Sequence, residues 1–598
     1  MLTKKTARKM APNRKLPELL SPAGSPEAVR AAVQAGADAV YFGGKTGNAR
    51  VHARNFTDEE IVGAINILHE YGRRAYITLN TLHTDRELKD MIKFAELCCI
   101  NGADAFILQD LGLAGIIKYY FPDISLHAST QAAGHNTDAF RVFKELGFSR
   151  AVAARELDAA NLKLLVDNSP VETEIFIHGA LCSSHSGRCF MSFALGNTRS
   201  ANRGSCAQPC RLEYERGHIL SLKDQCLAAH LEQIIEIAPA SLKIEGRMKR
   251  PEYVYHTAKI YRTCLDERRN AADSEIETLA KIFSRQGFTD GYFTRSLGKR
   301  MYGVRTEENK SETAGFKNII YAESATGKKA EARASRVSQA VFPRETIKNI
   351  NMNPKLSLIF NSRGQFLKVA DYLKTSGVLK RIYRIFMPLD GLNVPEDFAG
   401  LTDKTGIRLP YVIFDDEKER IYQELVLAKN KGVKYALVDN IGHIDIASGA
   451  GLELSGNAGL NITNSQALEE YKNLGFKDAL LSPELKFAQI RDISKSINAG
   501  IIAYGRINLM ISENKLPDYI KDKTGAVFPA FEDNGRSVLY NSVPVYLADK
   551  RGLYKNSGLF FIGLNFTVEP PEEIIKIING YVSPEKAELP GKFTRGYK

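Results

Sequence analysis

Five of the eight cysteines in this chain of 598 residues lie close together, between positions 182 and 226. Structural zinc sites usually show paired Cys-x2–4-Cys motifs, and only Cys206 and Cys210 approach that spacing. Four thiolates supplied by one long loop suit an iron–sulfur cluster better. Spacing alone leaves three interpretations open: an iron–sulfur site, a zinc site, or thiols that are reactive or buried. The five are Cys182, Cys189, Cys206, Cys210 and Cys226.

The cysteine loop follows the seventh of eight short apolar runs that alternate with helix-like segments. One such segment, SPEAVRAAVQAGA, begins with Ser-Pro and then places apolar residues at helical spacing. Apolar strands alternating with helices indicate a parallel sheet covered on both faces, and eight such units favour an α/β fold of the (β/α)8 barrel type. The predicted strands span 17–23, 38–44, 74–80, 104–110, 125–131, 150–156, 174–180 and 241–246.

Polar residues gather where these predicted strands end, which in a (β/α)8 barrel is the face that carries the chemistry. A cap or a loop hydrogen bond explains each of them taken singly, but their shared position predicts a functional site. The cysteine loop begins on the same face, directly after His178.

The second half of the chain repeats the first. Residues 124–157 can be laid over 452–485 at one constant offset, so that Asn136 falls on Asn464 and Glu156 on Glu484. Such a repeat predicts two related barrel-like domains. The second copy lacks the cysteine loop, so we assign the chemistry to the first. The predicted order is a basic arm (1–16), a cluster-bearing barrel (17–290), a connecting module (291–354), a degenerate second barrel (355–580) and a basic tail (581–598).

The composition excludes several classes of protein. Hydrophobic residues make up 44% and charged residues 25%, which argues against disorder, and eight cysteines are too few for a disulfide scaffold. No apolar run approaches a membrane span, and the first fifteen residues lack the apolar core of a secretory signal. We therefore expect a cytoplasmic protein without a membrane partner. The net charge of +12 is compatible with a polyanionic partner, although a solvated basic surface explains it as well.

Several longer motifs resemble peptidase family U32, the collagenase-like peptidases. The cysteine loop supplies HGALCSSHSGRCFMS and NRGSCAQPCR, and SLKIEGRMKRPEYV follows them. The opening segment LPELLSPAGSPEAVRAAVQAGADAVYFGG, the phrase LHASTQ, GFTDGYF and the closing LPGKFTRGYK resemble the same family. The resemblance is dense over the first 300 residues and looser beyond them.

This resemblance implies an activity that the family name does not describe. Better-understood relatives are oxygen-independent hydroxylases with a [4Fe–4S] cluster. They hydroxylate position 5 of a pyrimidine in ribosomal or transfer RNA, with prephenate implicated as the donor, or they act on a ubiquinone precursor. By resemblance, Cys182, Cys189 and Cys206 are cluster ligands, and the fourth ligand is Cys226 or Cys210.

We therefore expect an RNA hydroxylase, and we prefer ribosomal over transfer RNA because the longer, duplicated members resemble the ribosomal enzyme more. A pyrimidine has to leave its stack to enter a barrel mouth, so single-stranded or loop RNA is the expected substrate. Two alternatives stay open. One is a peptidase, although the chain has no HExxH, GxSxG or local Cys–His signature. The other is an accessory iron–sulfur protein of quinone hydroxylation.

The residues near the strand ends receive roles under this hypothesis. Carboxylates and a histidine can move protons or contact base edges, and Arg and Lys can pair with the carboxylates of a donor. The candidate catalytic residues are Glu156, His178, Glu245 and Arg247. The candidate substrate-binding residues are Arg155, Lys243, Lys249, Gln131 and Asn136.

Overall fold

The computed structural model describes residues 15–50, 54–196, 199–314, 332–334, 337, 342, 352–389, 401–583 and 591–597. Residues 1–14 of the predicted basic arm, 315–331 of the predicted connecting module and 584–590 of the predicted tail lie outside the described residues.

Eight parallel strands close into a barrel in the first half of the chain, which confirms the predicted fold class. Strand β1 pairs with β2 on one side and with β9 on the other, and β7 also pairs with β9. The short strands β8 (Asp224–Cys226) and β10 (Phe288–Thr289) extend the sheet beyond β7. The barrel strands are β1 (Glu18–Pro22), β2 (Ala39–Phe42), β3 (Arg74–Leu79), β4 (Ala105–Leu108), β5 (Ser125–Ala128), β6 (Arg150–Val152), β7 (Glu172–Ala180) and β9 (Ser241–Ile244).

Side-chain caps fix where the helices around this barrel begin. Ser25 accepts a hydrogen bond from the Ala28 N–H at the start of α1, and a capping box of Thr57 and Glu60 starts α2. The helices are α1 (Pro26–Gln34), α2 (Asp58–Glu70), α3 (Asp85–Ile100), α4 (Leu111–Tyr120), α5 (Thr137–Glu145), α6 (Ala159–Asn168), α7 (Met191–Gly196), α8 (Leu231–Ile237), α9 (Pro251–Asp266), α10 (Asp273–Ile282) and α11 (Glu307–Ala314).

A second closed barrel of eight parallel strands follows, as the internal repeat predicts. Its last strand, β23, pairs with both β11 and β17 and completes the ring. The strands are β11 (Lys355–Phe360), β12 (Ile382–Pro388), β13 (Thr405–Arg408), β14 (Tyr435–Val438), β15 (Glu453–Gly456), β16 (Asp478–Leu480), β17 (Asn498–Gly505) and β23 (Phe561–Phe566).

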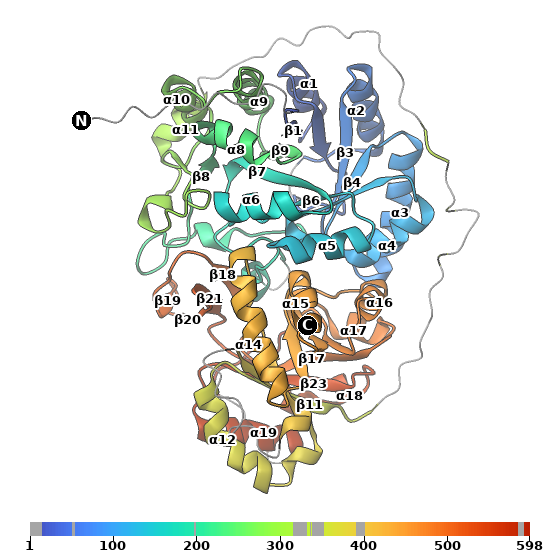
Figure 1. Ribbon diagram of the computed structural model, residues 1–598, viewed down its shortest axis with the longest axis vertical. Helices are drawn as coiled ribbons and strands as arrows, with labels where there is room; N and C mark the ends of the chain where they lie inside the picture. Colours follow the sequence, from blue (N-terminus) through green and yellow to red (C-terminus); the bar gives the residue numbers. More distant parts are fainter. Residues whose placement is uncertain are drawn as a thin grey trace.

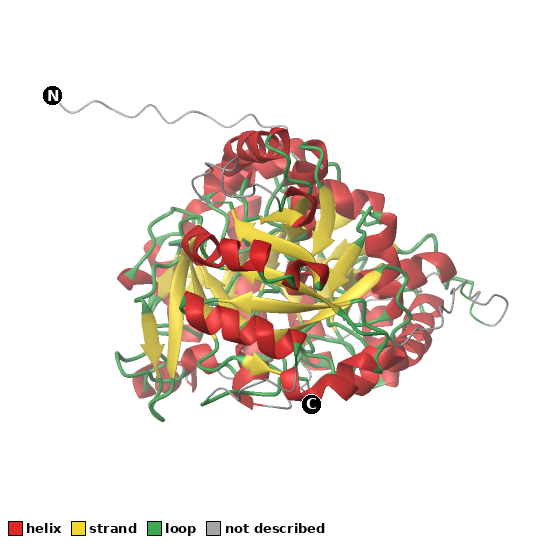
Figure 2. Cartoon of the chain, turned by 90° about the horizontal axis from the view of Figure 1, so that it is seen from below, coloured by secondary structure: helices red, strands yellow, loops and turns green. Residues whose placement is uncertain are grey.

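An antiparallel sheet is inserted between the last two strands of the second barrel, where the first barrel has its cysteine loop. It consists of β18 (Asn508–Ser512), β19 (Tyr519–Lys521), β20 (Val527–Asp533) and β21 (Arg536–Tyr540), and β22 (Val545–Tyr546) follows it. The described helices of the second half are α12 (Arg363–Thr375), α14 (Lys418–Asn430), α15 (Ile444–Gly449), α16 (Ser465–Asn473), α17 (Phe487–Asp492), α18 (Arg551–Lys555) and α19 (Pro571–Val582). Figure 2 shows helices surrounding the strands in the view from below.

The barrels meet through the loops and helix starts that follow the carboxyl ends of their strands (Figure 1). Asn136 caps α5 and also donates Nδ2 hydrogen bonds to the carbonyls of Ile413 and Gly442 in the second barrel. Asn464 caps α16 and donates in the same way to the His83 carbonyl in the first barrel. Because Asn136 and Asn464 are repeat equivalents, the contact is reciprocal, and the two barrel mouths face each other about an approximate twofold axis.

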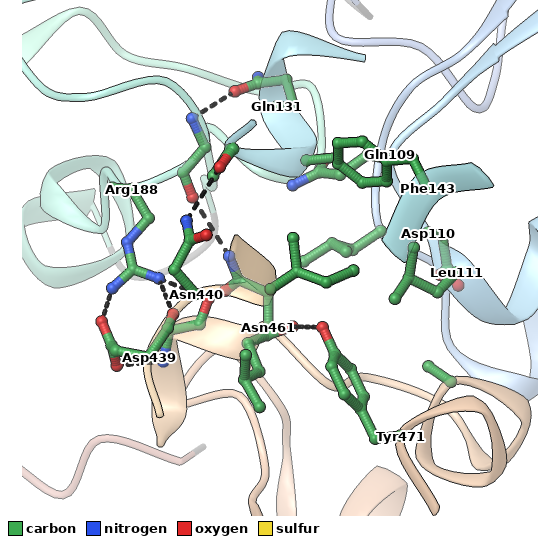
Figure 3. Close-up of a pocket in the computed structure, with 18 residues that line it drawn as sticks. Gln109, Asp110, Leu111, Gln131, Phe143, Arg188, Asp439, Asn440, Asn461 and Tyr471 are labelled. Carbon is green, nitrogen blue, oxygen red and sulfur yellow. Dashed lines mark hydrogen bonds and ion pairs between the residues drawn. The ribbon is translucent and has the colours of Figure 1, made fainter. Parts of the chain in front are cut away.

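Arg188, at the end of the cysteine loop's first turn, forms a buried ion pair with Asp439 of the second barrel (Figure 3). Its guanidinium also donates to the Gly459 carbonyl at 2.8 Å. Glycine is required at Gly112 and Gly442, because a Cβ there would lie 2.4 Å from the Oδ1 atom of the facing asparagine. Among the described residues, no helix is long and apolar enough to cross a membrane.

Candidate functional site

A cavity of about 130 Å³ lies at the carboxyl ends of the strands of the first barrel, where the strand-end residues predicted a site. One part of its wall comes from the cysteine loop and another from strand ends. Among the described residues that line it, Met510 alone belongs to the second barrel. The predicted site residues on this cavity are Gln131, Arg155, Cys182, Cys189, Cys206, Cys210, Lys243, Glu245 and Arg247.

Four of the five clustered cysteines line this one cavity. Cys182 follows β7, Cys189 and Cys206 lie in the loop beyond it, and Cys210 lies in the short helical turn Pro209–Arg211. Cys226 does not line the cavity. It lies in β8, is 8% exposed, and its Sγ is 3.6 Å from the Tyr261 hydroxyl. The placement therefore groups Cys210, rather than Cys226, with the other three thiols.

Four cysteine thiols are the donor type that iron–sulfur clusters use as ligands. Burial raises the pKa of Cys189, and the neighbouring thiols raise it further. Burial also raises the pKa of Cys210 to about 11. A bound cationic centre would stabilise their thiolate forms, and the Gln208 N–H, 3.3 Å from Cys206 Sγ, is the kind of donor that tunes such centres. In the described part of the chain, no group of three or more His, Cys, Asp or Glu side chains is arranged so that it could hold a metal ion.

Two cations on the cavity are neutralised by carboxylates. Arg50 Nη2 lies 2.9 Å from Glu245 Oε1, and Lys243 Nζ donates to Glu174 Oε1 at 2.8 Å. Burial favours the neutral form of Glu245, but Arg50, Arg155 and Lys249 outweigh it and lower the pKa of Glu245 to about 2. Glu245 is therefore ionised at neutral pH, which suits a partner of Arg50 better than a proton donor.

The other two cations have no carboxylate partner among the described residues. The Arg247 guanidinium donates to Thr78 Oγ1 at 2.5 Å and to Asn48 Oδ1 at 2.6 Å. Arg155 lies over the Phe176 ring and directs Nη1 toward Cys182 Sγ at 3.8 Å. The cavity therefore carries an excess of positive charge beside the thiols.

Two predicted catalytic residues lie away from the cavity lining. His178 is 1% exposed and contacts Tyr261 and Phe288, and burial and Lys249 lower its pKa to about 3. Glu156 is 4% exposed, burial raises its pKa, and His185 Nδ1 lies 3.8 Å from its Oε2.

Two predicted substrate-binding residues also lie elsewhere. Asn136 belongs to the contact between the barrels. Lys249 packs on the Phe283 ring with Nζ 2.8 Å from the ring centre, and burial lowers the pKa of Lys249 to about 7. Gln131 does line the cavity, where its Oε1 accepts a hydrogen bond from the Gly187 N–H.

Arg50 is the main site residue that the sequence interpretation missed. It lies in the loop after β2 rather than at a strand end, and Asn80 holds that loop by accepting a hydrogen bond from the Ala49 N–H at 3.0 Å. A basic residue in a loop that follows a barrel strand is the signal that could have identified it.

Named proteins similar to this chain include RNA-modifying ones. The chain is 37% identical to the 23S rRNA 5-hydroxycytidine C2501 synthase of Escherichia coli K12, over 48% of this chain and 44% of that protein. The chain thus spans less than half of that relative's length. It is 32% identical to the tRNA hydroxylation protein P1 of Bacillus subtilis 168, over 51% of this chain and 77% of that protein.

A third relative is named for proteolysis rather than for RNA modification. The chain is 33% identical to a collagenase of Porphyromonas gingivalis W83, over 48% of this chain and 74% of that protein. The family model described as "Peptidase family U32" matches residues 24–302, from α1 to the segment after β10, and residues 402–525, which include β13 to β19. The chain belongs to peptidase family U32.

Proposed function

We propose that this protein is an RNA hydroxylase that replaces the hydrogen on position 5 of a pyrimidine by a hydroxyl group. It depends on an iron–sulfur cluster and takes the oxygen from a small carboxylate donor, such as prephenate, rather than from O2. The observation that supports this proposal most strongly is the cavity at the mouth of the first barrel. It brings four cysteines and four cations together. Relatives named for RNA hydroxylation support the substrate class.

In this proposal Cys182, Cys189, Cys206 and Cys210 hold a [4Fe–4S] cluster, because these four share the cavity and Cys226 does not line it. The cluster supplies electron transfer when bound. Arg155 shields the Cys182 side of the site, and Gln208 and Ser192 donate hydrogen bonds to Cys206 Sγ.

The remaining residues of the cavity bind and orient a dianionic donor. Arg155 and Arg247 lack carboxylate partners in the described part of the chain, so two carboxylates can each be held by a guanidinium fork. Arg50 and Lys243 are already paired and set the shape of the wall. Exchange of C5–H for C5–OH oxidises the base by two electrons, so the donor that gives up the oxygen is reduced by two electrons in the same turnover.

The test is mass spectrometry of ribosomal and transfer RNA from a deletion strain. We expect one 5-hydroxypyrimidine to disappear, to return with the wild-type gene, and to stay absent with Cys206→Ala. Cys264→Ala is the matched control, because Cys264 lies buried in α9 outside the cavity lining, and it should restore the modification. An RNA modification profile unchanged by the deletion would contradict the proposal.

A further inference from the structure

A second hollow, of about 480 Å³, lies beside the cysteine loop and takes its walls from both barrels. The first barrel contributes Arg216 and His218 from the cysteine loop and Lys299 and Tyr302 from the segment after β10. The second barrel contributes Lys515 from the segment between β18 and β19. We call this hollow the basic groove.

The basic groove is strongly cationic. The side chains of Arg216, His218, Lys299 and Lys515 are all exposed, and none of the described residues that line the groove is acidic. Within the described chain, Arg216, Lys299 and Lys515 form no ion pair with a carboxylate. Arg216 instead lies 5.5 Å from the centre of the Tyr519 ring. The positive charge is therefore available to an anionic partner.

Backbone hydrogen bonds hold the walls of the groove in place without that partner. The Gly298 N–H donates to Asn514 Oδ1 at 2.8 Å and ties the two barrels together next to Lys299 and Lys515. The Leu516 N–H donates to Ser537 Oγ at 2.9 Å, and the Gly303 N–H donates to the Ser221 carbonyl at 2.8 Å. The backbone that carries these cations is therefore in place before a charged chain binds, which limits the ordering cost to the side chains.

A small buried cluster of side chains connects the basic groove to the start of the cysteine loop. Leu181, Leu222, Tyr292 and Met301 form a small buried cluster, and Tyr302 of the groove packs against it. Leu181 directly precedes Cys182. Arg211, next to Cys210, donates to the Leu181 carbonyl at 2.8 Å and to Ser221 Oγ at 3.1 Å. The groove is therefore joined by direct packing and hydrogen bonds to the residues that neighbour Cys182 and Cys210.

We propose that the basic groove binds the phosphodiester backbone of the single-stranded RNA that flanks the target pyrimidine. A positively charged groove with an aromatic residue at its side suits a single strand, whose phosphates it follows without reading sequence. The inference rests on the proposed function, since it names where the RNA of that reaction is held. It also gives the second barrel a role in substrate binding, through Lys515.

The test compares two double variants of the full chain that lose the same charge. Lys299→Gln/Lys515→Gln changes the groove, and Lys368→Gln/Lys374→Gln changes two exposed lysines of α12. Binding of a short fluorescein-labelled single-stranded RNA of mixed sequence is measured by anisotropy over a series of salt concentrations. We expect the groove variant to bind about tenfold more weakly, with a slope of log K against log salt shallower by about 1.4, since each single-strand phosphate contact contributes about 0.7. The α12 variant should match the wild type.

Two results would overturn the groove assignment: RNA affinity unchanged in the groove variant, or an equal loss in both variants. Neither result bears on the proposed function, which stands or falls on the RNA of the deletion strain. The two tests can therefore give different answers. If the deletion strain lacks the 5-hydroxypyrimidine but the groove variant binds RNA with wild-type affinity, the proposed hydroxylase function stands and the groove assignment is wrong.

Discussion

In the first barrel, the segment between the seventh and eighth strands carries four cysteines that line a cavity, whereas in the second barrel the same position holds the antiparallel strands β18–β21. The strand that follows differs too, because Glu245 and Arg247 of the first barrel correspond to Asn565 and Thr567. The helix caps at Asn136 and Asn464, however, are alike. The two copies thus share the asparagines that join the barrels and differ in the cysteine loop and at Glu245 and Arg247.

The two inserted segments contact each other. Glu513, which follows β18, places its Oε1 2.8 Å from Nε2 of His185 in the cysteine loop. Glu513 also pairs with Arg536 of the second barrel. Residues at the mouth of the second barrel thus contact and stabilise the cysteine loop of the first barrel.

The largest expected effect is the difference between substituting Cys210 and substituting Cys226, both in the first barrel. Cys210→Ser should abolish iron binding and RNA modification, because Cys210 shares the cavity with three other thiols, whereas Cys226→Ser should keep both. Iron content and visible absorbance after anaerobic purification, together with RNA mass spectrometry, measure the difference. The reverse pattern would make Cys226 the fourth ligand and would require β8 to move.

The next largest effect concerns the ion pair between the barrels. Asp439→Ala leaves Arg188 buried and unpaired, and loss of one partner of a buried pair costs about 3 kcal/mol of unfolding free energy. Urea unfolding followed by circular dichroism measures it. The control is Asp403→Ala, since Asp403 pairs with Lys434 at an exposed site and its loss should cost less than about 1 kcal/mol. Equal losses would show that the buried pair does not stabilise the contact between the barrels.

A smaller effect tests the symmetry of the contact. Asn136→Ala and Asn464→Ala each remove a helix cap and two hydrogen bonds to the other barrel, so each should cost about 2 kcal/mol or more, and the two losses should be similar. Ser362→Ala removes the cap of α12 alone and should cost about 1 kcal/mol. If Asn136→Ala lowers RNA modification without changing stability, Asn136 has the substrate role that the sequence predicts, not a structural one.

The fold could be predicted because each barrel strand is a short apolar run and each helix begins with a local signal. The cysteine cavity could be predicted in outline for the same reason, since Cys182 directly follows a strand. The positions of Cys226 and Asn136 could not be predicted from the sequence, because they depend on long-range contacts. Cys226 is placed by the antiparallel pairing of β8 with β7, and Asn136 by the docking of a second barrel. Arg50 was missed because its loop carries no strand-end pattern.

The smallest expected effect compares two buried carboxylates that are repeat equivalents, Glu484 and Glu156. Burial raises the pKa of Glu484 from 4.5 to about 7. The folded protein therefore binds more protons than the unfolded chain between these values, and stability falls as pH rises through that window. Glu484→Gln removes this loss of stability with rising pH. The variant should be more stable than the wild type by about 1–2 kcal/mol at pH 8 and of similar stability at pH 4.

Glu156→Gln should gain less than Glu484→Gln at pH 8. Burial also raises the pKa of Glu156, but His185 lies 3.8 Å away and Arg155 nearby favours the charged form, so ionisation of Glu156 is partly compensated. Thermal unfolding of both variants across the pH range, with the exposed Glu453→Gln as control, measures the difference. A larger gain for Glu156→Gln would show that the groups near Glu156 do not compensate its negative charge.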